Sequence, residues 1–201
     1  MRARTQGVGE AVPAGIYLVI GMMVCVFALQ VLWDPQAKVL GRCILSRASV
    51  AGILGHMWLH NGLVHLVVNL VFVWVVGRVL CLRMAASVFL ASYVLAGVVG
   101  GLAHLAYDGR TMTGASGAIA GLLGMYAVLC FDRMGRAGPW LIVTWFALNA
   151  GHAVLDRSGP AYAAHCAGFV AGMLTAAALV RLGKSAQPAC PPPQVAAAPG
   201  V

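Results

Sequence analysis

The sequence predicts an all-α membrane protein, a single bundle of about six transmembrane helices. Of its 201 residues, 61% are hydrophobic and only 9% are charged, whereas a soluble domain carries roughly 25% charged and about 45–50% apolar residues. The apolar residues form runs long enough to cross a hydrocarbon core, and the charged residues lie in short segments between them. A lipid bilayer is the solvent that suits so apolar a surface, because a soluble fold needs a polar one.

The spans follow one another with short connections. They cover residues 14–33, 56 or 60 to 80, 84–107, 116–131, 138–155 and 161–182. The first is too long for the apolar region of a signal peptide. The fourth has about 16 residues before Asp132, which is roughly 24 Å of helix and short of a core about 30 Å thick. Around this transmembrane domain (14–182), we expect a cytosolic N-terminus (1–13) and a disordered tail (183–201) that is rich in Pro and Ala.

Loop charges orient the predicted bundle. With the N-terminus in the cytoplasm, the inner segments hold eight arginines and lysines and the outer segments hold five. Positive charge favours the cytoplasmic side, so we expect both termini there. The net charge of +8 is scattered in ones and twos, which does not predict nucleic-acid binding. The six cysteines are also scattered, without metal-ligand or CxxC spacing, which is typical of small buried hydrophobic residues.

A serine between glycines stands at the start of the fourth span, in the sequence Gly114-Ala115-Ser116-Gly117. Glycines let the backbone turn sharply and let another helix approach closely. Free N–H groups and the helix dipole favour negative charge at a helix N-terminus. The position therefore suits a nucleophile with an adjacent oxyanion site. An ordinary N-cap serine beside a packing motif is the structural alternative.

A histidine in the sixth span shares one helical face with two glycines. His165, Gly168 and Gly172 are spaced i, i+3 and i+7. Ser116 shares a similar small-residue face with Gly124 on the fourth span. If these faces meet, the imidazole comes within hydrogen-bond reach of the serine and can act as its general base. A core histidine with a structural role is the alternative. The spans offer no acidic residue, so the pattern predicts a dyad, not a triad.

Polar residues also lie at the start of the second span. His65 and Asn69 are spaced i, i+4, and both can donate hydrogen bonds to an oxyanion together with the backbone of Ser116. His56 and His104 raise the alternative of a metal site. No carboxylate or cysteine joins these histidines as a further metal ligand. We therefore do not predict a metal site, and we interpret His152 as structural.

Three patterns together resemble the signature motifs of rhomboid intramembrane serine proteases, in order, spacing and span. They are Gly114-Ala115-Ser116-Gly117, Trp58-Leu59-His60-(four residues)-His65-Leu66-(two residues)-Asn69, and Ala164-His165-(two residues)-Gly168-Phe169-(two residues)-Gly172. The resemblance implies a rhomboid-like six-helix bundle of the bacterial type, in the inner membrane, acting without a cofactor. Two features depart from the family. No tryptophan accompanies the arginines of the first outer loop, and no acidic residue follows the second span.

The resemblance also implies roles for individual residues. Ser116 would be the nucleophile and His165 its base, with His65, Asn69 and Ser116 binding the oxyanion. We assign His60, Gly114 and Gly117 to the substrate-binding surface.

These roles imply an endopeptidase that cleaves single-pass transmembrane proteins within or next to the bilayer. Two alternatives come from other functional classes. One is a catalytically silent rhomboid-like protein that binds transmembrane clients. The other is a small transporter or channel, for which inverted repeats and half-helices are expected.

Overall fold

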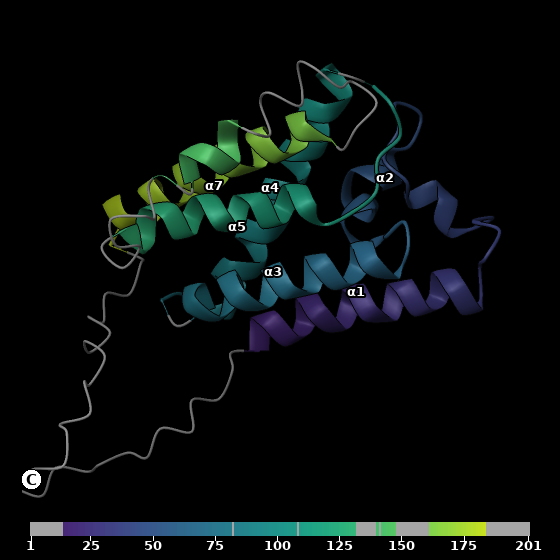
Figure 1. The fold of residues 1–201 in the computed structure, drawn as a ribbon, viewed down its shortest axis with the longest axis horizontal. Coiled ribbons are helices and arrows are strands. Elements are labelled where there is room, and N and C mark those ends of the chain that lie inside the picture. Colours follow the sequence, from purple (N-terminus) through teal and green to yellow (C-terminus); the bar gives the residue numbers. More distant parts are fainter. Residues whose placement is uncertain are drawn as a thin grey trace, which may run out of the picture.

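The computed structural model describes residues 14–81, 83–107, 109–131, 140, 142–147 and 161–183, and most of them are helical (Figure 1). Four of the helices are long and apolar enough to cross a membrane, and one apolar helix is shorter. The chain is thus an all-α membrane bundle, as predicted. The elements are α1 (Ala14–Leu32), η1 (Leu40–Cys43), α2 (Val50–Gly55), η2 (His56–Trp58), α3 (Leu63–Cys81), α4 (Ala86–Tyr107), α5 (Ser116–Leu129) and α7 (Tyr162–Arg181).

The helix bounds agree with the predicted spans, with one correction. The second span was predicted to begin at His56 or His60, but α3 begins at Leu63. The chain first makes the short turn η2 and then bends at Gly62, whose φ of +125° suits a residue without a side chain. Of the predicted fifth span, the structure describes only residues 140 and 142–147, so His152 lies outside the described residues. So do the predicted N-terminal segment 1–13 and residues 184–201 of the tail.

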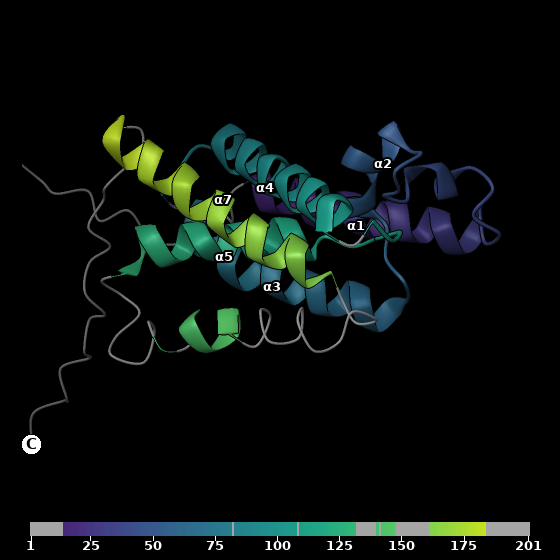
Figure 2. The same ribbon diagram turned by 90° about the horizontal axis from the view of Figure 1, so that it is seen from above.

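The short helix α5 lies at the centre of the bundle, in contact with α3, α4 and α7 (Figure 2). Its 14 residues extend over roughly 21 Å, less than the hydrocarbon thickness of about 30 Å. Most residues of α5 are buried, whereas α1 buries a single stripe and leaves its other apolar side chains exposed. The neighbouring helices therefore enclose the polar end of α5, which could not face lipid.

Glycines bring α5 and α7 into backbone contact. A Cβ atom added at Gly168 would overlap the carbonyl oxygen of Gly117, and one added at Gly172 would overlap the carbonyl oxygen of Gly121. From the other side, a Cβ at Gly124 would overlap a carbonyl oxygen of α7. The two small-residue faces predicted from the sequence therefore meet, at a distance that only glycine permits.

Two arginines cap helix ends, Arg47 from an exposed position and Arg83 from a partly buried one. Arg47 Nη2 donates to the carbonyl oxygen of Leu105 near the end of α4, at 3.1 Å. Arg83 Nη1 donates to the carbonyl oxygen of Leu129, the last residue of α5. Guanidinium groups at these positions pair with carbonyls that have no partner in the helix and oppose the negative end of the helix dipole. They fix the loop before α2 and the loop before α4 against the helices that surround the site.

The segment between η2 and α3 is anchored to α1. The backbone N–H of His60 donates to Gln30 Oε1 at 3.0 Å, and Gln30 Nε2 donates to the carbonyl oxygen of His60 at 3.3 Å. The His60 ring is buried and lies edge-on to the His65 ring, with 5.2 Å between the ring centroids. Burial, followed by the nearby His65, lowers the pKa of His60 to about 4. This ring is therefore neutral at physiological pH.

Substitution of a helix-contact glycine should destabilise the fold. In Gly172→Leu, the added side chain meets the backbone of α5, and we expect a loss of about 3 kcal/mol or more, at or above the upper end of the usual cost of overpacking. Thermal unfolding in detergent micelles would measure it. Gly21→Leu on α1 is the matched control, because nothing lies within 4 Å of a Cβ added there. Equal melting temperatures for the two variants would contradict the packing argument.

Stability should depend on pH through His60. Between pH 6.5 and about 4, the exposed ring of the unfolded chain is protonated while the buried ring is not, so the unfolded state binds more protons and stability falls as the pH falls. We expect the melting temperature of His60→Phe to fall less steeply than that of the wild type over this range. At pH 8 and above, where the ring is neutral in both states, the difference between the two melting temperatures should no longer change with pH. Parallel curves down to pH 4 would contradict this prediction.

Candidate active site

Ser116 is the first residue of α5, directly after a loop that bends at Gly114, where φ is +119°. One turn further on, Ile119 N–H donates to the carbonyl oxygen of Ala115 at 2.9 Å. The N–H groups of Ser116 and Gly117 therefore precede the helical hydrogen-bond ladder. They give the serine hydroxyl a neighbourhood of backbone donors at the positive end of the helix dipole.

The loop before Ser116 is held by backbone hydrogen bonds. Met112 and Leu45 exchange N–H···O bonds of 3.1 and 3.0 Å, and Gly114 N–H donates to the carbonyl oxygen of His56 at 2.8 Å. His56 is buried, and its Nδ1 is 2.8 Å from the carbonyl oxygen of Gly52. His56 thus joins the loop before Ser116 to α2. His104, the other histidine of the metal alternative, has its Nε2 3.0 Å from the carbonyl oxygen of Arg110.

His165 reaches Ser116 from the first turn of α7. The distance between His165 Nε2 and Ser116 Oγ is 2.8 Å, and the backbone contact between α5 and α7 sets the register of the two residues. In the arrangement that proton transfer requires, the hydroxyl donates and a neutral Nε2 accepts. Trp145 faces the imidazole with a ring-centroid distance of 6.4 Å and a tilt of 33°, and Tyr162 meets it edge-on at 6.1 Å. Two aromatic rings thus bound the histidine on different sides.

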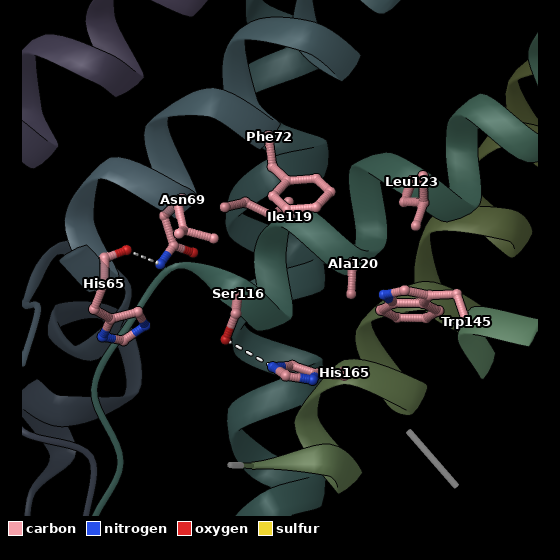
Figure 3. Close-up of a pocket in the computed structure, with 10 residues that line it drawn as sticks. His65, Asn69, Phe72, Ser116, Ile119, Ala120, Leu123, Trp145 and His165 are labelled. Carbon is pink, nitrogen blue, oxygen red and sulfur yellow. Dashed lines mark hydrogen bonds between the residues drawn. The ribbon is translucent and has the colours of Figure 1, made fainter. Parts of the chain in front are cut away.

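His65 and Asn69 face Ser116 from α3, one turn apart. Asn69 Nδ2 donates to the carbonyl oxygen of His65 at 2.7 Å. An amide nitrogen carries two hydrogens, and this bond uses one. The His65 ring lies against Gly114, where an added Cβ would be 2.7 Å from Cε1 and 2.9 Å from Nε2. Figure 3 shows Ser116 between this pair and His165.

These four residues share a cavity of about 310 Å³. Its walls are mostly apolar and come from α3, α5, α7 and the helical segment 142–147 (Figure 3). The lining residues are His65, Val68, Asn69, Phe72, Ser116, Ile119, Ala120, Leu123, Trp145 and His165. Polar groups that converge in an apolar cavity are typical of a binding or catalytic site.

The other predicted site residues lie beside the cavity without lining it. The His60 ring packs behind His65, and Gly114 contacts the His65 ring from the loop before Ser116. Gly117 faces α7, where its carbonyl oxygen limits the approach of Gly168. Their assignment to substrate binding thus stays a prediction. At Gly114 the positive φ and the close His65 ring explain why glycine is needed, whereas a Cβ at Gly117 would make only ordinary contact with Ala164.

Sequence analysis missed two aromatic residues of the cavity wall. Phe72 follows His65 and Asn69 at i+7 and i+3 on the same face of α3, so helical spacing could have revealed it. Trp145 lies in a segment without a polar motif, and no pattern pointed to it. Its place over His165 follows from tertiary packing alone.

Comparison with known proteins agrees with this geometry. The rhomboid domain family matches residues 47–182. Rhomboid protease GluP of Bacillus subtilis is 35% identical over 128 residues, which cover 60% of this chain and 24% of that protein. Rhomboid protein 1, mitochondrial, of Saccharomyces cerevisiae is 29% identical over 181 residues, 79% of this chain and 51% of that protein. Rhomboid protease GlpG of Serratia proteamaculans is 31% identical over 130 residues, 61% and 46% respectively.

The chain thus spans between about a quarter and a half of the length of these relatives. The matched range begins in the loop before α2, ends just after α7, and takes in every residue that lines the Ser116 cavity. Since that range is more than half of the chain and corresponds to a bundle of apolar helices, this integral membrane protein belongs to the rhomboid family.

Proposed function

We propose that this protein is an intramembrane serine endopeptidase in which Ser116 is the nucleophile and His165 the general base. The observation that carries the proposal is the 2.8 Å distance between Ser116 Oγ and His165 Nε2 inside an apolar cavity. A serine hydroxyl is a weak nucleophile unless an adjacent base takes its proton. In the described part of the chain the single acidic residue is Asp34, whose carboxylate binds the backbone N–H groups of residues 38–40. We therefore propose a dyad.

Acylation begins when Ser116 Oγ attacks the carbonyl carbon of the scissile peptide while its proton passes to His165 Nε2. The carbonyl oxygen becomes an oxyanion, which the backbone N–H of Ser116, the remaining Asn69 amide hydrogen and the His65 imidazole stabilise. Donors fixed in advance around such an oxyanion are usually a large part of catalysis, and removal of one costs roughly 10²–10³ in kcat. The rigid start of α5 and the i, i+4 pair on α3 supply this preorganisation.

The tetrahedral intermediate then collapses. The carbon–nitrogen bond breaks, His165 returns its proton to the departing amine, and the acyl group remains as an ester on Ser116. Water attacks this ester with His165 again as the base, which releases the carboxylate product and restores the hydroxyl. The cavity has to admit that water, and the polar end of α5 is where water can enter an apolar bundle.

The surroundings of the dyad support a transmembrane substrate. Val68, Phe72 and Leu123 give the cavity an apolar wall between membrane-spanning helices, where an apolar segment binds better than a charged one. We infer that the substrates are single-pass membrane proteins cut within or next to the bilayer. With both termini in the cytoplasm of a bacterial cell, Ser116 lies below the outer surface of the inner membrane, because α5 is too short to span it.

Labelling with a fluorophosphonate probe tests the dyad. Ser116 Oγ displaces fluoride from phosphorus, and the serine proton passes to His165. We expect covalent labelling of the wild-type protein in micelles, none in Ser116→Ala, and a rate at least about 100-fold lower in His165→Ala, the usual worth of a general base. A folded wild-type protein that does not label would favour the silent client-binding protein. Labelling that persists in Ser116→Ala would place the nucleophile elsewhere.

Asn69 should contribute to turnover more than to binding. Asn69→Ala removes a donor that acts on the oxyanion, so we expect kcat for a transmembrane substrate to fall by roughly 10²–10³ while KM changes little. Val67→Ala is the control, since Val67 is on the same helix and nearly half exposed toward lipid. A rise in KM at unchanged kcat would show that Asn69 binds substrate and does not stabilise the transition state.

A further inference from the structure

We propose that Thr113 and Asn61 are positioning residues that hold the His65 imidazole in the tautomer an oxyanion site needs. The inference rests on the proposed function for its catalytic consequence. Its structural content is a chain of hydrogen bonds, from the loop that carries the nucleophile to the ring that faces it. The loop then determines both the position of Ser116 and which ring nitrogen of His65 carries the hydrogen.

The first step is the turn that precedes α3. Asn61 and Gly62 form a bend, and Leu66 N–H then donates to the carbonyl oxygen of Gly62 at 3.1 Å. The bend directs the backbone N–H of Asn61 to His65 Nδ1, at 3.4 Å. This hydrogen bond is long, so its strength depends on how firmly the bend is held in place.

The second step is the proton on the ring. Because Asn61 N–H is a donor, His65 Nδ1 must accept, and a neutral imidazole then carries its hydrogen on Nε2. Nε2 lies beside Gly114, two residues before Ser116, and the ring lines the cavity. In the other tautomer two N–H donors would face each other at Asn61, and Nε2 would have no hydrogen to offer an oxyanion.

The third step is the set of hydrogen bonds that hold the bend in place. Thr113 Oγ1 donates to Asn61 Oδ1 at 2.8 Å, and Thr113 is part of the loop that backbone hydrogen bonds fix to His56 and Leu45. From the other side, Gln30 on α1 binds both backbone groups of His60. The bend is thus held between α1 and the nucleophile loop, and the Thr113 hydroxyl is the side-chain link to that loop.

The variants Thr113→Val and Thr113→Ser separate this role from packing. Valine keeps the shape and removes the hydroxyl, whereas serine keeps the hydroxyl. We expect Thr113→Val to lower the fluorophosphonate labelling rate and kcat about tenfold at unchanged KM, less than the loss on removal of a donor itself, and Thr113→Ser to retain wild-type values. Thr175→Val on α7 is the matched control, since it removes a hydroxyl that bonds its own helix and should leave both rates unchanged.

Two further measurements show whether Thr113 acts through His65. In a His65→Ala background, Thr113→Val should have no further effect, because the group it positions is gone. In ¹⁵N-histidine-labelled protein, the nitrogen resonances of His65 report the tautomer without any need for activity. We expect Nε2–H in the wild type and a mixture of tautomers in Thr113→Val, with resonances assigned by their loss in His65→Ala.

Three results would overturn the inference: an Nδ1–H tautomer in the wild type, an unchanged tautomer in Thr113→Val, or equal rate losses from Thr113→Val with and without His65. A failure of the proposed function looks different. The wild-type protein would then not label at Ser116, while the His65 tautomer would still respond to Thr113→Val.

Discussion

The backbone contact between α5 and α7 is the constraint on which the site depends. Lipid gives apolar helices no reason to associate through hydrophobicity, so close packing must hold them together. At Gly168 and Gly172 the absence of a side chain lets the backbone of α7 contact carbonyl oxygens of α5 directly. The helices thereby lock in a single register, and that register puts Ser116 Oγ and His165 Nε2 at 2.8 Å. Reacting groups lose much of their advantage when misplaced by about 1 Å, so in the proposed mechanism packing precision and catalytic geometry have the same origin.

The short length of α5 explains why the polar residues gather at one end of the bundle. A helix of 14 residues leaves irregular backbone at membrane depth, and each unpaired polar group there costs several kcal/mol. Polar groups of the loop before Ser116 form hydrogen bonds with Leu45, His56 and Asn61, all of which lie outside the long helices. The same arrangement leaves the first N–H groups of α5 available to a ligand. A position that is costly for folding is thus the one that supplies the donors of the proposed mechanism.

The sequence predicted the features of the fold that depend on spacing. The stripe of His165, Gly168 and Gly172 and the pair His65 and Asn69 follow helical periodicity, and the structure places both where their faces indicated. The start of the second span was wrong because the chain makes the turn η2 and bends at Gly62 before α3 begins. Contacts between separate loops, and the packing of Trp145 on His165, have no local period. They depend on how elements distant in sequence meet.

Among the described residues, no carboxylate lies beside the histidine of the proposed dyad. An ionised carboxylate within hydrocarbon is costly and must be paired to persist. The rings of Trp145 and Tyr162 bound the imidazole of His165 instead, and they restrict its rotation without bringing a charge into the cavity. Aromatic packing can thus orient the histidine here at a lower desolvation cost, a role that an aspartate has in soluble serine proteases.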